Sequence, residues 1–260
     1  MNTNRFFIYL SFNGTHYNGW QSQKNAISIQ EVLENHLSLL LSEKIKLTGA
    51  GRTDTGVHAT YFVAHFDSSN VIIKDKEYLI YRINSFLPKD IAVFDLKQVK
   101  PHANSRFHAI KRTYKYHISG TKEPFMYDFF YLISKEKFKA IDIDLFNAGC
   151  QLIMNIEDFT SFSKVGTQTK TNNCIIYEAK GIKENMHFTF SITANRFLRN
   201  MVRALTGTLL DVAWAKTSIP ELKHIINNKK RSDAGKSVPA KGLFLTDIKY
   251  PDVIFLSNEE

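Results

Sequence analysis

The 260-residue sequence predicts an α+β fold in which short strands and amphipathic helices are arranged in two similar halves. Three observations indicate this fold. Apolar residues recur at helical spacing in some segments and alternate in others, turn signals such as Asn13-Gly14 separate the segments, and the second half repeats the order of the first with insertions. Apolar runs stay well short of the ~20 residues that cross a bilayer, so we expect no membrane association.

The first half, residues 1–105, reads as strand, helix, strand, strand, helix, strand. Strands are expected at residues 6–12, 45–48, 61–66 and 91–99, and helices at residues 28–41 and 75–86. Ser28 is predicted to cap the first helix because Glu31 follows three residues later, as in a capping box. Pro88 ends the second helix.

The second half, residues 106–260, is predicted to repeat this plan. Strands are expected at residues 111–118, 174–182, 187–193 and 243–250, and helices at residues 144–154, 197–213 and 220–227. We therefore expect two tandem ferredoxin-like units whose mixed or antiparallel sheets join edge to edge, with helices on one side and a cleft on the other. The segment 229–239, which begins Lys-Lys-Arg, is predicted to be a mobile loop that can contact phosphate.

Charge and cysteine usage narrow the functional classes. Lys and Arg total 34 against 25 Asp and Glu, a formal net charge of +9, and residues 106–260 hold 23 of the bases and 16 of the acids. Such an excess suits a polyanionic partner. Cys150 and Cys174 have no metal-ligand spacing and predict neither a zinc site nor a disulfide, which favours a reduced, cytoplasmic setting. No histidine pair shows metal-ligand spacing either, so no metal or other cofactor is expected.

The run from Gly51 to Ala59, Gly-Arg-Thr-Asp-Thr-Gly-Val-His-Ala, is the most informative segment. Its two glycines allow a sharp bend and a close approach to another molecule. If the segment is extended, Arg52 and Asp54 point the same way, which places a cation beside a carboxylate. From residue types alone, a polar hairpin with a surface arginine explains the pattern equally well.

This string resembles the signature of the TruA-type tRNA pseudouridine synthases, in which the aspartate is catalytic. The resemblance continues, in the family's order, through five further segments: residues 14–21, 111–116, 158–162, 195–203 and 242–243. Six matching strings cover nearly the whole chain. The resemblance implies the same pair of mixed sheets, with an RNA-binding cleft.

The resemblance also implies roles for individual residues. Asp54 is the catalytic residue, Arg203 lies against it, Tyr114 stacks on the target base, and Leu243 lines the pocket. Arg52 is expected to fill the space left by a flipped base or to hold a phosphate. The periodicity places Arg196, Arg199 and Arg203 on one face of the helix expected from Phe197, where Arg199 meets RNA phosphate. Arg112 shares a strand face with Tyr114 and is also expected to bind substrate.

Four other residues of the matched segments are expected to be structural. His58 is predicted to donate or accept a structural hydrogen bond, Trp20 and Tyr116 to pack in the core, and Asp158 to form a turn. For Leu243, packing in the core without any contact to substrate is nearly as good an explanation as a place in the pocket.

The resemblance implies tRNA as the partner, with modification of uridines 38, 39 and 40 in the anticodon arm, a homodimer, and no DNA. Two rival functions remain. A glycosidase or nucleoside hydrolase would typically need a second carboxylate, which the motif does not offer. A non-catalytic RNA-binding module would have no use for Asp54. The sequence leaves open whether Asp54 attacks C1′, adds to C6 of the base or abstracts a sugar proton.

Overall fold

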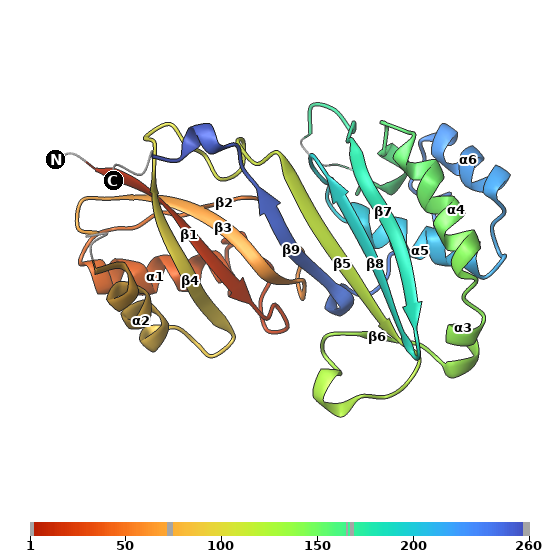
Figure 1. The fold of residues 1–260 in the computed structure, drawn as a ribbon, viewed down its shortest axis with the longest axis horizontal. Coiled ribbons are helices and arrows are strands. Elements are labelled where there is room, and N and C mark those ends of the chain that lie inside the picture. The colour runs from red at the N-terminus through yellow and green to blue at the C-terminus, as the bar shows by residue number, and fades with distance from the viewer. Residues whose placement is uncertain (1–2, 72–74, 165, 167–168, 257–260) are drawn as a thin grey trace. The chain divides into compact units, whose positions relative to one another are not determined.

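The computed structural model describes residues 3–71, 75–164, 166 and 169–256 (Figure 1). Over these residues the fold is α+β, with mostly antiparallel strands and helices, as the sequence predicts. The chain divides into two compact units. The first comprises Met1–Ile110 and Leu245–Glu260, and the second comprises Lys111–Phe244.

The first unit follows the predicted order β1, α1, β2, β3, α2, β4. Its elements are β1 (Asn4–Phe12), α1 (Ile29–Leu41), β2 (Thr48–Gly49), β3 (His58–Ser68), α2 (Lys76–Phe86) and β4 (Ile91–Val99). The strands run in the order β4-β1-β3, antiparallel throughout, and β2 pairs with β3. Figure 1 shows α1 and α2 together on one face of this sheet.

Burial explains these first-unit elements. Residues Phe6 to Leu10 of β1 are at most 4% exposed, so this strand is continuously apolar rather than alternating, as is typical of a strand that is covered on both faces. The predicted cap of α1 is confirmed: Ser28 Oγ accepts a hydrogen bond from the Glu31 amide at 3.3 Å. Ile29, Leu33 and Leu37 then face the sheet and are at most 1% exposed.

The strand predicted at residues 45–48 is wrong over most of its length, because β2 contains Thr48 and Gly49 alone. The reason lies in the backbone of Leu47. Its amide donates to Glu34 Oε1 at 2.9 Å, and its carbonyl accepts from Gln30 Nε2 at 3.0 Å. Two side chains of α1 therefore take the groups that a strand would use for ladder bonds.

The second unit contains a three-stranded antiparallel sheet, β5-β8-β7, with the short strand β6 parallel to β5. Its elements are β5 (Lys111–Ser119), β6 (Tyr131–Leu132), α3 (Lys135–Lys139), α4 (Ile143–Met154), β7 (Ile176–Glu184), β8 (His187–Ala194), α5 (Met201–Ala213) and α6 (Ile219–Asn228). In Figure 1, α4, α5 and α6 gather on one face of this sheet. The sequence analysis missed β6 and α3, which are two and five residues long.

The helix that we predicted to begin at Phe197 begins instead at Met201. This correction changes where two of the predicted site arginines lie. Asn200 has a φ of +65°, a left-handed conformation that cannot continue a helix, and the carbonyl of Arg199 accepts from the Lys164 amide at 3.1 Å. Arg196 and Arg199 therefore precede α5. The predicted helical face shared by Arg196, Arg199 and Arg203 does not exist.

The segment 229–239 is tied down, contrary to the expectation of a mobile loop. Arg231 donates to the carbonyls of Ala234 and Gly235 at 3.3 and 3.1 Å and to Ser237 Oγ at 2.8 Å. The amide of Gly235 donates to Thr208 Oγ1 on α5 at 3.0 Å. Arg231 thus acts as an internal brace for the loop.

The last strand, β9 (Leu243–Lys249), leads the chain back to the first unit from Leu245 on. The sequence analysis places this strand with the second half of the chain. In the first unit, Tyr250 packs edge-on against Phe7 with ring centroids 5.1 Å apart, and its hydroxyl donates to the Ser105 carbonyl at 2.6 Å. Among the described residues, no helix is long and apolar enough to span a membrane.

Candidate active site

Asp54 lies in the loop between β2 and β3 and is partly buried. The loop turns immediately after it: the Val57 amide donates to the Asp54 carbonyl at 3.1 Å, and Gly56 has a φ of +76°. A residue with a Cβ is strained at that φ, so the second glycine of the motif is needed for the turn. Arg52, two residues before Asp54, is exposed.

The first motif segment, residues 14–21, packs directly on this loop. The Trp20 amide donates to Thr53 Oγ1 at 3.0 Å, and the Gly56 amide donates to the Tyr17 carbonyl at 3.3 Å. A Cβ on Gly19 would collide with the Thr53 carbonyl oxygen, so this close approach requires glycine. Two strings that are separated in sequence therefore form one clamp that fixes the backbone on either side of Asp54.

Three of the structural assignments made for the matched segments of the chain are confirmed. His58 is 1% exposed, and its Nδ1 accepts from the Gly14 amide at 3.0 Å. Trp20 is 1% exposed and stacks on Phe62 with centroids 4.2 Å apart. Asp158 Oδ1 accepts from the amide and hydroxyl of Thr160 at 2.9 and 2.6 Å, which is the expected turn.

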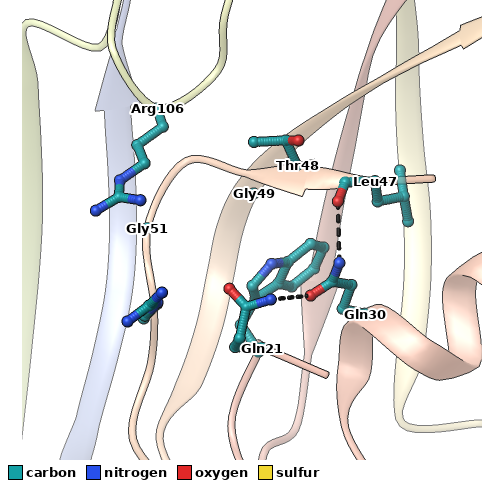
Figure 2. Close-up of a pocket in the computed structure, with 9 residues that line it drawn as sticks. Gln21, Gln30, Leu47, Thr48, Gly49, Gly51 and Arg106 are labelled. Carbon is teal, nitrogen blue, oxygen red and sulfur yellow. Dashed lines mark hydrogen bonds between the residues drawn. The ribbon is translucent and has the colours of Figure 1, made fainter. Parts of the chain in front are cut away.

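A hollow of about 100 Å³ adjoins the Asp54 loop within the first unit (Figure 2). It is lined by Trp20, Gln21, Gln30, Leu47, Thr48, Gly49, Gly51, Arg52 and Arg106. Two arginines and no acidic residue line it. Of these residues the sequence analysis expected only Arg52 to contact substrate, and it assigned no role to Gln21, Gln30 or Arg106.

A buried polar network lies behind this hollow. Gln30 Oε1 accepts from Gln21 Nε2 at 2.9 Å, and Gln30 Nε2 donates to Glu34 Oε1 at 2.9 Å. Glu34 is 7% exposed and forms an ion pair with Lys46 at 2.8 Å. The sequence held one signal for this network, since Gln30 and Glu34 lie four residues apart beside the buried apolar face of the predicted helix.

The second unit holds the other predicted site residues. Tyr114 on β5 is 8% exposed, and its ring meets Phe197 edge-on with centroids 5.1 Å apart. Arg112 Nη1, two residues earlier, donates to the Asn195 carbonyl at 2.9 Å. The β5 strand and the segment before α5 are thus held together beside Tyr114.

Arg203 lies on the first turns of α5 and is partly buried. Its Nε donates to the Val238 carbonyl at 2.8 Å, and the hydroxyl of Tyr116 donates to the next carbonyl, that of Pro239, at 2.7 Å. Tyr116 itself is fully buried, as expected for a core residue. The segment 238–239 therefore fixes the guanidinium of Arg203 from one side.

The remaining predicted residues differ in burial. Leu243, the first residue of β9, is 6% exposed. Arg199 is exposed and precedes α5. Within the second unit, Arg112, Tyr114, Arg199, Arg203 and Leu243 come from four neighbouring segments: β5, the turn before α5, α5, and the start of β9.

The described residues provide neither a group of side chains that could hold a metal ion nor a reactive thiol. Among them, no group of three or more His, Cys, Asp or Glu side chains could hold a metal ion. Cys150 and Cys174 are free and buried, and burial raises their thiol pKa values to about 12 and about 11. Both thiols therefore stay protonated and unreactive at neutral pH.

Comparison with known proteins identifies the class of protein to which the chain belongs. The family model described as tRNA pseudouridine synthase matches residues 156–251. The tRNA pseudouridine synthase A of Parabacteroides distasonis is 43% identical over 251 residues, which is 96% of this chain and 98% of that protein. Its namesake in Porphyromonas gingivalis is 44% identical over 254 residues, which is 97% and 99% of the two chains. That of Clostridium acetobutylicum is 37% identical over 93% of this chain and 97% of its own length.

The protein is thus a pseudouridine synthase, an isomerase. At this identity and coverage, the chain belongs to the tRNA pseudouridine synthase A family.

Proposed function

We propose that the protein converts uridine to pseudouridine at positions 38, 39 and 40 in the anticodon arm of tRNA, in the cytoplasm. The observation that supports this most directly is the similarity to tRNA pseudouridine synthase A over nearly the whole chain. The clamped loop around Asp54 adds support, because a carboxylate that acts on one bond must be held in a fixed place.

The reaction is an isomerisation. The C1′–N1 bond of the nucleotide breaks, the uracil turns while it stays bound, and a C1′–C5 bond forms as the C5 proton leaves and N1 gains one. The reaction needs neither an oxidant nor an energy source. One positioned carboxylate can serve as nucleophile or stabilise charge on the sugar, and we assign that role to Asp54.

The other site residues receive supporting roles in this proposal. We propose that Arg203 holds the Asp54 carboxylate, and its anchoring through Nε to Val238 supports a fixed guanidinium. Tyr114 and Leu243 receive the base, and Arg52 either fills the space that the flipped nucleotide leaves or holds a phosphate beside it. Arg112 and Arg199 contact the RNA backbone. Of these two, Arg199 is exposed, which suits a contact with RNA phosphate.

The charge distribution supports an RNA partner. The second unit carries 21 Lys and Arg against 12 Asp and Glu, whereas the first carries 13 of each. The whole formal charge of +9 therefore resides in Lys111–Phe244.

We further propose that the two units are ferredoxin-like. The strand order β4-β1-β3-β2 of the first unit supports this proposal. We also propose that the enzyme acts as a homodimer.

The decisive experiment incubates the protein with an unmodified tRNA transcript and maps pseudouridine at each position. We expect conversion at uridines 38, 39 and 40. Release of free uracil would instead indicate a hydrolase, and tight binding with no product would indicate a non-catalytic RNA-binding protein.

A further inference from the structure

We propose that the hollow beside the Asp54 loop is a subsite for one ribose-phosphate group of the RNA backbone, read by Gln21, Arg52 and Arg106. The inference builds on the proposed action on RNA and adds Gln21 and Arg106 as binding residues. It concerns a nucleotide next to the target, not the target uridine itself.

The volume of the hollow argues for part of a polymer. Sites that enclose whole small molecules usually measure about 300–1,000 Å³. A hollow of about 100 Å³ is smaller, so it suits one group of a chain that is bound elsewhere as well.

The charge of the lining argues for an anion. Arg52 and Arg106 enter the lining from different segments, and Figure 2 shows Arg106 reaching toward Gly51 from the opposite side to Gln21. Guanidinium groups bind phosphate with paired hydrogen bonds, and the residues that line the hollow include no acidic side chain.

The orientation of Gln21 argues for a hydrogen-bond donor beside that anion. Gln30 Oε1 accepts from the Ser22 amide at 3.0 Å, while Gln30 Nε2 donates to Glu34 and to the Leu47 carbonyl. These partners fix which way the Gln30 amide points, and it in turn takes the Nε2 hydrogen of Gln21. The side-chain oxygen Oε1 of Gln21 is therefore turned away from Gln30, toward Gly51, as Figure 2 shows.

The combination of an oxygen acceptor with two guanidinium groups matches RNA. A ribose carries a 2′-hydroxyl that can donate to Gln21 Oε1, and its phosphate can accept hydrogen bonds from Arg52 and Arg106, which line the same hollow. DNA lacks that hydroxyl. The buried carboxylate of Glu34, paired with Lys46, holds the chain of hydrogen bonds in this direction.

The test measures binding of an anticodon stem-loop RNA, with and without single 2′-deoxy substitutions, in an Asp54→Asn background. We expect one 2′-deoxy position to weaken binding about three- to tenfold, and Gln21→Met to abolish the sensitivity to that position. Gln23→Met is the matched control, because Gln23 is exposed on the same segment and does not line the hollow. A 2′-deoxy penalty that persists unchanged in Gln21→Met would overturn the proposal.

A second arm tests the phosphate and stays informative if Gln21→Met does not fold. Arg106→Gln should flatten the dependence of log Kd on log salt by about 0.7, the value for one phosphate of single-stranded RNA. Arg82→Gln, an exposed arginine on α2, should leave the slope as in wild type. An unchanged slope for Arg106→Gln would remove this arginine from the subsite. Because both arms measure binding, a lack of pseudouridine product would contradict the proposed reaction alone.

Discussion

At the residue scale, the clamp around Asp54 gives three residues of the matched segments a structural role. Thr53 accepts from Trp20, Gly56 turns the chain, and Gly19 allows the close approach of residues 14–21. Thr53 and Gly56 thus fix the backbone on either side of Asp54, whose carboxylate we propose to act on substrate.

We expect Asp54→Asn to reduce turnover to a small fraction of wild type while RNA affinity stays nearly the same. The substitution removes the charge and keeps the shape, so it affects the reaction more than binding. Single-turnover pseudouridine formation and Kd should be measured on the same tRNA. Substantial residual turnover would refute the assignment of Asp54.

His65 makes the stability of the first unit dependent on pH. Burial, with a contribution from the charge of Arg5, lowers the pKa of His65 from 6.5 to about 4. Its Nδ1 lies 3.2 Å from the Ser105 amide and accepts that hydrogen bond in the neutral form. The unfolded chain binds a proton below pH 6.5 and the folded chain does not, so stability falls as pH drops from about 6.5 to about 4.

We expect this titration to cost on the order of 1–3 kcal/mol of unfolding free energy between pH 7 and pH 4. His65→Asn should lower stability at pH 7 but flatten the decline below it. Part of the decline should remain, because burial also lowers the pKa of His117 to about 4. Urea unfolding across this pH range measures the effect, and equal slopes for wild type and variant would contradict it.

At the element scale, periodicity predicted most helices and strands, and local side-chain competition explains the failures. Helix α1 began one residue after its predicted cap, and β4 covers the range predicted for it, Ile91–Val99. The strand at 45–48 failed because Gln30 and Glu34 took the backbone groups of Leu47. These bonds join residues 13 and 17 positions apart, so the pattern of residues 45–48 itself gives no sign of them.

The prediction that Arg196, Arg199 and Arg203 share one face of a helix was wrong for a different reason. Residues 197–200 continue the apolar period of the helix, yet Asn200 adopts a left-handed conformation and Leu198 is buried outside the helix. Because Leu198 is buried, its apolar side chain falls in the spacing expected of a helix although it lies outside the helix.

The prediction that the loop 229–239 is mobile was also wrong. Its basic residues suggest a solvated loop, whereas Arg231 donates hydrogen bonds to three groups of the loop itself.

We expect Arg231→Met to destabilise the protein by about 1–3 kcal/mol, because it leaves the carbonyls of Ala234 and Gly235 and the hydroxyl of Ser237 without this donor. Lys230→Met, one residue earlier and exposed, is the matched control and should change stability by less than about 0.5 kcal/mol. Chemical denaturation of both variants decides the matter. A stable Arg231→Met protein would mean that the loop does not need its brace.

At the scale of the whole molecule, the sequence predicted the α+β class and the excess of positive charge in the second half, but not the return of the chain. Strand β9 follows the second unit in sequence and joins the first from Leu245 on. Its apolar pattern fits a strand in either unit. Only the fold shows that Tyr250 packs against Phe7, more than two hundred residues away.

The absence of metal-ligand spacing in the sequence leads to a prediction for the whole enzyme. We expect turnover to survive exhaustive treatment with EDTA, since a carboxylate can carry this isomerisation alone. The substrate must be a tRNA shown to be folded without magnesium, so that the chelator acts on the protein only. Loss of turnover that zinc specifically restores would show that a metal site exists.

Because the second unit carries all of the net positive charge, we predict that its residues account for most of the salt dependence of RNA binding. RNA affinity should fall steeply with ionic strength, with a slope of about −0.7 to −0.9 for each phosphate neutralised. Lys230 and Lys236 are exposed in the second unit, which carries the whole net charge, so Lys230→Ala with Lys236→Ala should flatten the slope by about 1.4–1.8. Lys44→Ala removes an exposed charge from the neutral first unit and should not change the slope. If all three substitutions shifted the slope equally per charge, binding would follow net charge alone, and the second unit would lose its special role in holding the RNA.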